Sequence, residues 1–79
     1  MVTKESISNL VWDTTAMNIK CWYEIVFVNH MVMIVDKIHV NWKNETIRVY
    51  YHDYGTNTDV LVGADIPIGI IYRIEVKQC

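Results

Sequence analysis

The chain has 79 residues and a formal net charge of −2 at pH 7, and 52% of its residues are hydrophobic. This length predicts one domain over residues 1–79, and the charge excludes the strongly basic surface typical of many nucleic-acid-binding domains. No apolar run approaches the about eighteen residues of a membrane span, so we expect no membrane segment. Eleven isoleucines and eleven valines against two leucines predict a mainly β chain, because β-branched residues favour strands.

The first expected element is a short helix over residues 3–11. Thr3 is a typical N-cap residue, and Ile7 and Leu10 recur at a spacing that places them on one helical face. A helix this short needs to dock on other elements to persist. We expect residues 13–15 to form the connector that follows it.

From residue 19 the apolar pattern changes to a period of two, which predicts strands over residues 19–28 and 31–42. Asn29-His30 between them suits a two-residue hairpin turn. Pairing around that turn sets Tyr23 against Asp36, where we expect a bend or bulge. The residues expected in the core are Ile19, Cys21, Tyr23, Ile25 and Phe27 from the first strand and Val32, Ile34, Ile38, Val40 and Trp42 from the second.

Three further strands are expected over residues 47–54, 59–62 and 71–77. Closing Trp42 on Ile47 keeps one face of the second hairpin apolar and points Tyr51 inward. In the last strand the residues expected to face inward are Tyr72, Ile74 and Val76. Pro67 cannot occupy a central strand position, so residues 65–69 are expected to form an irregular or 3₁₀ turn.

A helix followed by five short antiparallel strands, with a tight turn before the fifth, is similar to the layout of SH3-like and Sm-like small barrels. The fold class expected from the sequence is therefore mainly β, as a five-stranded antiparallel small barrel with a short N-terminal helix. This comparison concerns the order of the elements, so it predicts a fold and no particular function.

The first hairpin carries a second apolar face opposite the expected core. Its members are Trp22, Val26, Val28, Met31, Met33 and Val35. Six exposed side chains of this kind would form a patch at the upper limit for monomers, so something should cover them. The N-terminal helix alone could do so, and the other interpretation is self-association of this hairpin into a homo-oligomer.

The chain shows no set of residues typical of catalysis or metal binding. In the expected register His30, His39 and His52 are not neighbours, and no ligand spacing for a metal occurs. Cys21 points into the expected core, where a thiol is inert. We therefore expect no enzyme activity, no metal and no cofactor.

The outer face of the second hairpin interleaves basic and aromatic residues, as on surfaces that bind single-stranded nucleic acid. The residues that would carry such a site are Lys37, Lys43, Arg48 and Tyr50, with His39, Asn41 and His52 between them. The rest of the surface is acidic. Nucleic-acid binding is therefore an alternative that the sequence does not favour.

The stretch Val49-Tyr-Tyr-His-Asp-Tyr-Gly55 runs into an Asn-containing turn and a further strand. With Tyr51, Asp53 and Tyr54 at these positions, the segment Tyr51–Pro67 resembles the Tudor family. In that family aromatic side chains form a cage that binds methylated arginine or lysine through cation–π attraction. The resemblance implies that Tyr51 and Tyr54 are walls of such a cage, with Trp22 or Trp42 as a further wall.

The function expected from the sequence is non-catalytic recognition of a partner protein or a polar or cationic ligand at one edge of the barrel. The expected site residues are Tyr50, Tyr51, His52, Asp53, Tyr54 and Asn57. One alternative is a small inhibitor, of the kind viruses and mobile elements encode, that sequesters a host factor. The start of the chain lacks the order of a signal peptide, and Cys21 and Cys79 form no disulfide framework, so a cytoplasmic location is expected.

Overall fold

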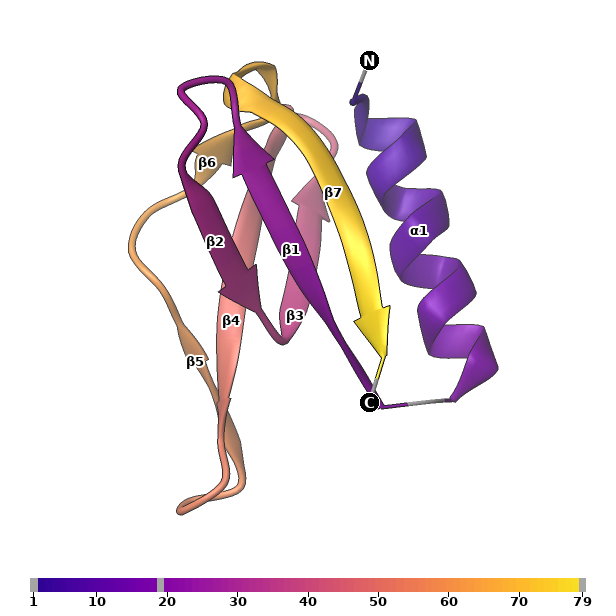
Figure 1. Cartoon of the computed structure of the whole chain (residues 1–79), viewed down its shortest axis with the longest axis vertical. Coiled ribbons are helices and arrows are strands. Elements are labelled where there is room, and N and C mark those ends of the chain that lie inside the picture. The colour runs from indigo at the N-terminus through magenta and orange to yellow at the C-terminus, as the bar shows by residue number, and fades with distance from the viewer. Residues whose placement is uncertain (1, 19, 79) are drawn as a thin grey trace.

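A computed structural model of the chain describes residues 2–18 and 20–78 (Figure 1). Its elements are α1 (Lys4–Met17), β1 (Cys21–Phe27), β2 (Val32–Val35), β3 (Lys37–Asn41), β4 (Thr46–Asp53), β5 (Thr58–Leu61), β6 (Ile66–Pro67), a 3₁₀ turn (Ile68–Ile70) and β7 (Ile71–Gln78). The expected mainly β chain with an N-terminal helix is confirmed. Within the described ranges there are seven strands, so the expected number of five is wrong. The expectations for Ile19 and Cys79 lie outside the described residues.

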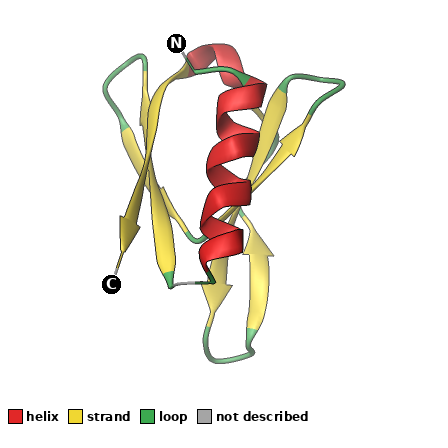
Figure 2. Ribbon diagram, turned by 90° about the vertical axis from the view of Figure 1, so that its right-hand side faces the viewer, coloured by secondary structure: helices red, strands yellow, loops and turns green. Residues whose placement is uncertain are grey.

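The strands form two antiparallel sheets, one in the order β2-β1-β7 and one in the order β3-β4-β5, with β6 also paired to β4. The sheets are not closed into a barrel, so the expected barrel is wrong. Helix α1 contacts β3 and β7 and fills the space between these edges of the two sheets (Figure 2). On the opposite side β2 is the edge of its sheet (Figure 1).

Helix α1 begins where the sequence predicts but ends later. The Thr3 hydroxyl accepts a hydrogen bond from the Ser6 amide at 3.0 Å, and the Ser6 hydroxyl accepts one from the Thr3 amide at 2.9 Å. This reciprocal capping satisfies two amides that the first helical turn leaves free. The helix continues to Met17 and ends at Asn18, whose φ of 51° is left-handed. The expected end at residue 11 is therefore wrong.

The helix continues through residues 13–15, the expected connector, because Thr14 is buried against the first sheet. Its hydroxyl lies 3.0 Å from the carbonyl oxygens of Leu10 and Val11 and also pairs with the Tyr23 hydroxyl. A threonine has a low intrinsic helix propensity, so this tertiary contact stabilises a helical turn that local sequence would not.

Burial of Tyr23 gives the fold a dependence on alkaline pH. Burial raises the pKa of the Tyr23 phenol, although its hydrogen bond with Thr14 partly opposes the change. Because the folded-state pKa lies above the unfolded value of about 10, Tyr23 stabilises the fold below about pH 10. That contribution is lost as pH rises through the folded pKa.

We expect Tyr23→Phe to reduce the fall in melting temperature between about pH 9 and pH 11, since it removes the group that must ionise. Thermal unfolding followed by circular dichroism measures this. The matched control is Tyr72→Phe, because Tyr72 is 66% exposed. An equal reduction in both variants would contradict the assignment to Tyr23.

The first hairpin has a different register from the expected one. Its turn holds three residues, Val28 to His30, with His30 left-handed at φ 71°. The extra residue moves the pairing by one position, and a one-residue slip exchanges the two faces of a strand. Val35 is therefore 1% exposed and Ile34 is 51% exposed, so the expected inward positions of Val32 and Ile34 are wrong.

The bend expected at Asp36 is present and separates β2 from β3, so the single strand over residues 31–42 is wrong. After the bend, the side chains expected to face the core do so: Ile38 is buried and Val40 packs against the core. The chain thus changes from one sheet to the other at the residue where the apolar alternation changes phase.

In the second hairpin the expected inner face is confirmed but the register is shifted by two positions. Val40 pairs with Ile47 rather than Val49, and the turn covers residues 42–45. A shift of two leaves each side chain on its face. The shift nevertheless moves Trp42 into the turn and places Tyr51 on the inner face but beyond the core. Both side chains are about half exposed, so their expected burial in the core is wrong.

Strand β7 pairs with β1 and forms the edge of the first sheet opposite β2. Ile71 is buried, and Ile74 and Val76 pack against the core as expected. Tyr72 is exposed because the pairing of β7 with β1 is irregular next to it, which leaves an extra residue in β7. The 3₁₀ turn precedes this strand as expected, and Pro67 lies in the two-residue strand β6.

Candidate functional site

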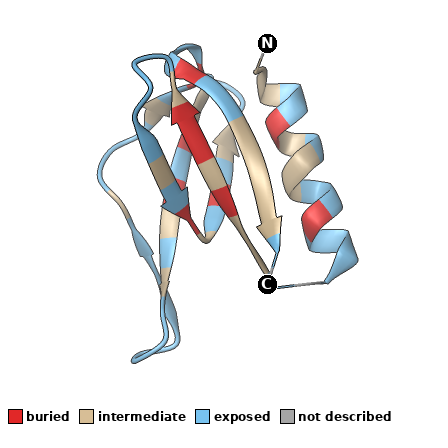
Figure 3. Cartoon of the chain, in the orientation of Figure 1, coloured by how far each residue is buried: buried red, intermediate tan, exposed pale blue. Residues whose placement is uncertain are grey.

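The hairpin of β4 and β5 extends beyond the body of the two sheets, and we call residues 50–61 the arm (Figure 1). Its pairing runs from Tyr50 opposite Leu61 to Asp53 opposite Thr58. All four residues of β5 are exposed, and Figure 3 shows exposed residues along the tip. The arm contains all six expected site residues.

The tip of the arm has a defined conformation. The Asp53 carboxylate accepts a hydrogen bond from the Gly55 amide at 2.9 Å, which is a typical aspartate turn. The hydroxyls of Thr56 and Thr58 are 2.6 Å apart, and Asn57 has a left-handed φ of 54°. Asp53 and Asn57 therefore shape the turn that presents Tyr54.

Asp59 joins the arm to the neighbouring strand β3. Its carboxylate lies 2.6 Å from the Lys37 ammonium and 2.9 Å from His52 Nδ1. The hydrogen bond from Lys37, followed by that from His52, lowers the pKa of the Asp59 carboxyl. The group is solvent-exposed, so we expect the pair to fix geometry more than to add stability. The sequence already placed Lys37 and His52 on one outer face, but no feature of the local sequence adds Asp59 to them.

The base of the arm is fixed by Asp36 at the bend between β2 and β3. The Asp36 amide donates to the Tyr50 carbonyl at 2.9 Å, and its carboxylate accepts from the His52 amide at 2.7 Å. The side chain thus continues the hydrogen-bond ladder of β4 past the point where β3 begins. Asp36 was not among the expected site residues.

Tyr54 lies between a histidine and a lysine. Its ring packs edge-to-face on the His52 ring at a centroid distance of 4.6 Å, and the Lys20 ammonium lies 5.3 Å from its centroid. A hollow of about 260 Å³ adjoins these groups. Its lining residues are Thr14, Thr15, Lys20, Cys21, Tyr23, Asp36, Lys37, His52 and Tyr54.

The two tyrosines that the Tudor resemblance implies as cage walls do not pack on each other. Tyr51 lies opposite Val60, and both side chains are about half exposed. The aromatic partner of Tyr54 among the described residues is His52, which alternates with Tyr51 along β4. Trp42 lies in the turn at the other end of β4, with the Lys4 ammonium 5.2 Å from its ring centroid. Trp22 is partly buried in β1.

The basic residues on the outer face of β3 and β4 are partly neutralised by neighbouring acids. Lys37 pairs with Asp59, and the Arg48 guanidinium lies 2.8 Å from the Asp65 carboxylate, which raises the pKa of Arg48. His39 does lie opposite Arg48, as a continuous basic strip would require. The paired charges nevertheless leave little positive potential for phosphate, so this face gives weak support to nucleic-acid binding.

The six residues expected to drive self-association do not share one exposed face. Met33 and Val35 face the core, Val26 is buried, and Trp22 is partly buried. The exposed large apolar side chains at this end of the first sheet are instead Val28, Met31, Val32, Ile34, Ile70 and Tyr72. The three-residue turn exchanged the faces of β2, and residues 70 and 72 come from the distant end of the chain.

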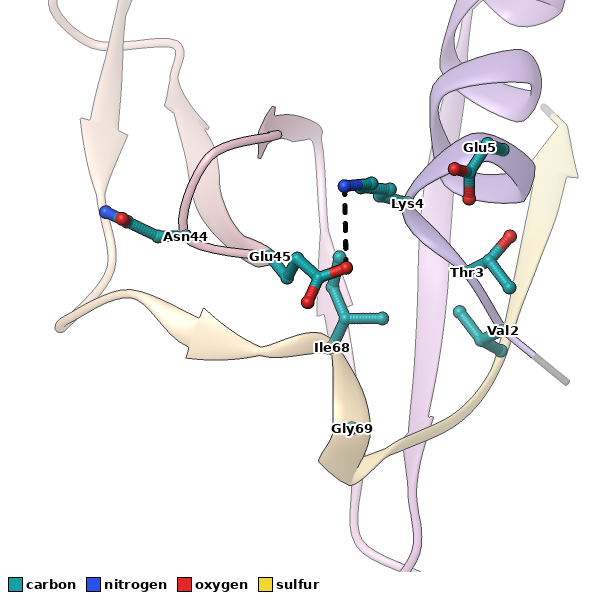
Figure 4. A pocket seen from close by; sticks show the side chains of 8 residues that line it. All are labelled: Val2, Thr3, Lys4, Glu5, Asn44, Glu45, Ile68 and Gly69. Carbon is teal, nitrogen blue, oxygen red and sulfur yellow. Dashed lines mark ion pairs between the residues drawn. The ribbon is translucent and has the colours of Figure 1, made fainter.

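A hollow of about 430 Å³ lies where α1 begins and the β3–β4 turn meets the 3₁₀ turn (Figure 4). Lys4 and Glu45 face each other across it at 3.5 Å. Thr3, which also lines it, is already used as the helix cap. Lys4 and Glu45 are thus paired within the protein, and Glu5 is a further charged residue that lines the hollow.

Within residues 2–18 and 20–78, no group of three or more histidine, cysteine or acidic side chains is placed to hold a metal ion. In the same residues no helix has the length and apolar character to cross a membrane.

Comparison of the chain with protein-family models, with curated proteins and with solved structures found no match. The arm and its surroundings are therefore interpreted from their own geometry, and the resemblance to the Tudor family stays a prediction.

Proposed function

We propose that the chain is a non-catalytic protein-binding module that contacts its partner through the arm, and that Tyr54 receives a cationic side chain of that partner. The observation that supports this most directly is the position of Lys20, whose ammonium lies 5.3 Å from the Tyr54 centroid. A cation on this ring is already favourable within the protein, so a methylated or unmethylated cation from a partner could replace it.

The construction of the arm also supports a binding role. It exposes Tyr51, Tyr54, Val60 and Leu61, and aromatic residues are enriched at the centres of protein interfaces. Hydrogen bonds accepted by the carboxylates of Asp36, Asp53 and Asp59 fix its base, tip and side. A pre-organised loop loses little conformational freedom on binding, which favours affinity.

The test is a titration with a short peptide that carries one trimethyllysine, observed through the NMR signals of the Tyr54 and His52 rings. We expect Tyr54→Ala to weaken binding about fivefold, since one cation–π contact contributes about 1 kcal/mol. Lys20→Ala should strengthen binding, because it removes the internal competitor for the Tyr54 ring. Tyr72→Ala is the matched control, an exposed tyrosine on the other sheet.

The same peptide with norleucine in place of trimethyllysine separates charge recognition from apolar contact. Equal binding of both peptides, or unchanged binding after Tyr54→Ala, would contradict the proposal. Tighter binding of the trimethyllysine peptide than of the norleucine peptide supports the proposal.

A further inference from the structure

We propose that a second copy of this chain binds along β2, so that the sheet β2-β1-β7 continues across a two-fold axis into β2 of the second copy. This surface lies on the other sheet from the arm, and the proposal does not depend on the proposed function.

Strand β2 has a free backbone edge. Among the described residues it pairs only with β1, and the Phe27 amide donates to the Met31 carbonyl at 2.9 Å. Hydrogen-bonded positions alternate in an antiparallel ladder, so the next one in β2 is Met33. The amide and carbonyl groups of Val32 and Ile34 therefore point away from β1, toward the open edge.

This edge lacks the features that usually prevent pairing. Edge strands in soluble proteins tend to carry lysine, proline, a bulge or a covering element. The sequence of β2 is Val-Met-Ile-Val, and the side chains of Val32 and Ile34 are more than half exposed. Helix α1 covers the opening on the opposite side of the molecule and does not reach β2 (Figure 1).

The edge is complementary to itself. A two-fold axis through Met33 sets Val32 opposite Ile34 of the second copy, and Ile34 opposite Val32 of the second copy. These positions have outward-pointing backbone groups, so the two pairs can form four hydrogen bonds, and their apolar side chains meet on one face.

The polar residues at the two ends of β2 also favour a second copy as the occupant. The same axis places His30, in the turn before β2, level with Asp36 of the second copy, at the bend after β2. At each end of the pairing an imidazole, which can donate a hydrogen bond, therefore lies level with a carboxylate, which can accept one. A parallel arrangement would instead place like ends together.

The first test compares the self-association of four chains by sedimentation equilibrium. We expect the wild-type chain to dimerise at micromolar concentrations and Ile34→Lys to raise the dissociation constant about tenfold or more, because the pairing would bury a lysine beside an apolar strand. Ala16→Lys adds the same charge on an exposed position of α1 and should leave the dissociation constant unchanged. Tyr54→Ala, in the arm, should also still dimerise.

A wild-type chain that remains monomeric to about millimolar concentration would overturn the proposal, as would an unchanged dimer after Ile34→Lys. Val32→Lys serves as the second variant if Ile34→Lys does not fold.

The second test fixes the register by oxidation of single-cysteine chains in which Cys21 and Cys79 are replaced by alanine. Met33→Cys should form a disulfide-linked dimer, because residues paired across the axis have Cα atoms about 4.5 Å apart. Val32→Cys should not, since two residues of offset along the strand separate its copies by more than about 7 Å. Cross-linking of Val32→Cys alone would overturn the pairing about Met33.

Discussion

Ile25→Ala is expected to lower the free energy of unfolding by about 2–5 kcal/mol, the largest effect of any single substitution considered. Ile25 is 0% exposed and lies at the middle of β1, the central strand of its sheet. Truncation leaves a cavity between the two sheets that this small core cannot easily fill. Because a domain of this size is only marginally stable, a large part of the population should unfold.

Urea unfolding followed by tryptophan fluorescence measures this loss, with Ile34→Ala as the matched control. Ile34 is also in the first sheet, and truncating its half-exposed side chain should cost less than about 1 kcal/mol in the monomer. A larger cost for Ile34→Ala than for Ile25→Ala would contradict the observed phase of β2. The measurement is made at low protein concentration so that self-association does not contribute.

Asp36→Ala is expected to destabilise the protein by about 1–3 kcal/mol, because it removes the acceptor of the partly buried His52 amide. The loss should be concentrated in the arm. Hydrogen exchange of the His52 amide should accelerate strongly, while the amide of Ile25 in β1 should change only with global stability.

Asp36→Asn is the matched control for this change, since its side-chain oxygen can still accept the bond. We expect it to recover more than half of the stability that Asp36→Ala loses. Equal losses in both variants would show that the charge of Asp36, rather than its position as an acceptor, is what matters.

The sequence predicted the class of the fold and the location of the helix start, because both depend on local chemistry. β-branched composition indicates strands, and the Thr3 cap is confirmed by two short-range hydrogen bonds. The end of the helix could not be predicted in this way. It depends on the contact between Thr14 and Tyr23, which only exists once α1 lies on the first sheet.

The phase of β2 shows a second limit. Both faces of the segment Met31–Val35 are apolar, so the pattern could not decide which face is inside. The additional turn residue, with His30 in the left-handed conformation, decides which face of β2 lies in the core. By contrast, the second hairpin has one apolar and one polar face, and its inner face was predicted correctly although its register was not.

The candidate site was predicted only as far as it is continuous in sequence. The stretch from Tyr50 to Asn57 forms one strand and most of the tip of the arm. The residues that fix and complete it, namely Lys20, Asp36, Lys37 and Asp59, come from other elements. Lys37 was expected only as part of the alternative nucleic-acid site. Pairing between strands decides which of these residues meet, so the local sequence does not indicate their contacts.

The pairing of β1 with β7 has a consequence for how the protein is made. β1 lies near the start of the chain and β7 near residue 78, yet they are direct neighbours from Cys21 beside Gln78 to Phe27 beside Ile71. During synthesis β1 must wait for residues 71–78 before one of its two edges is covered. Until that segment is made one edge of β1 is unpaired, and unpaired strand edges favour aggregation during folding.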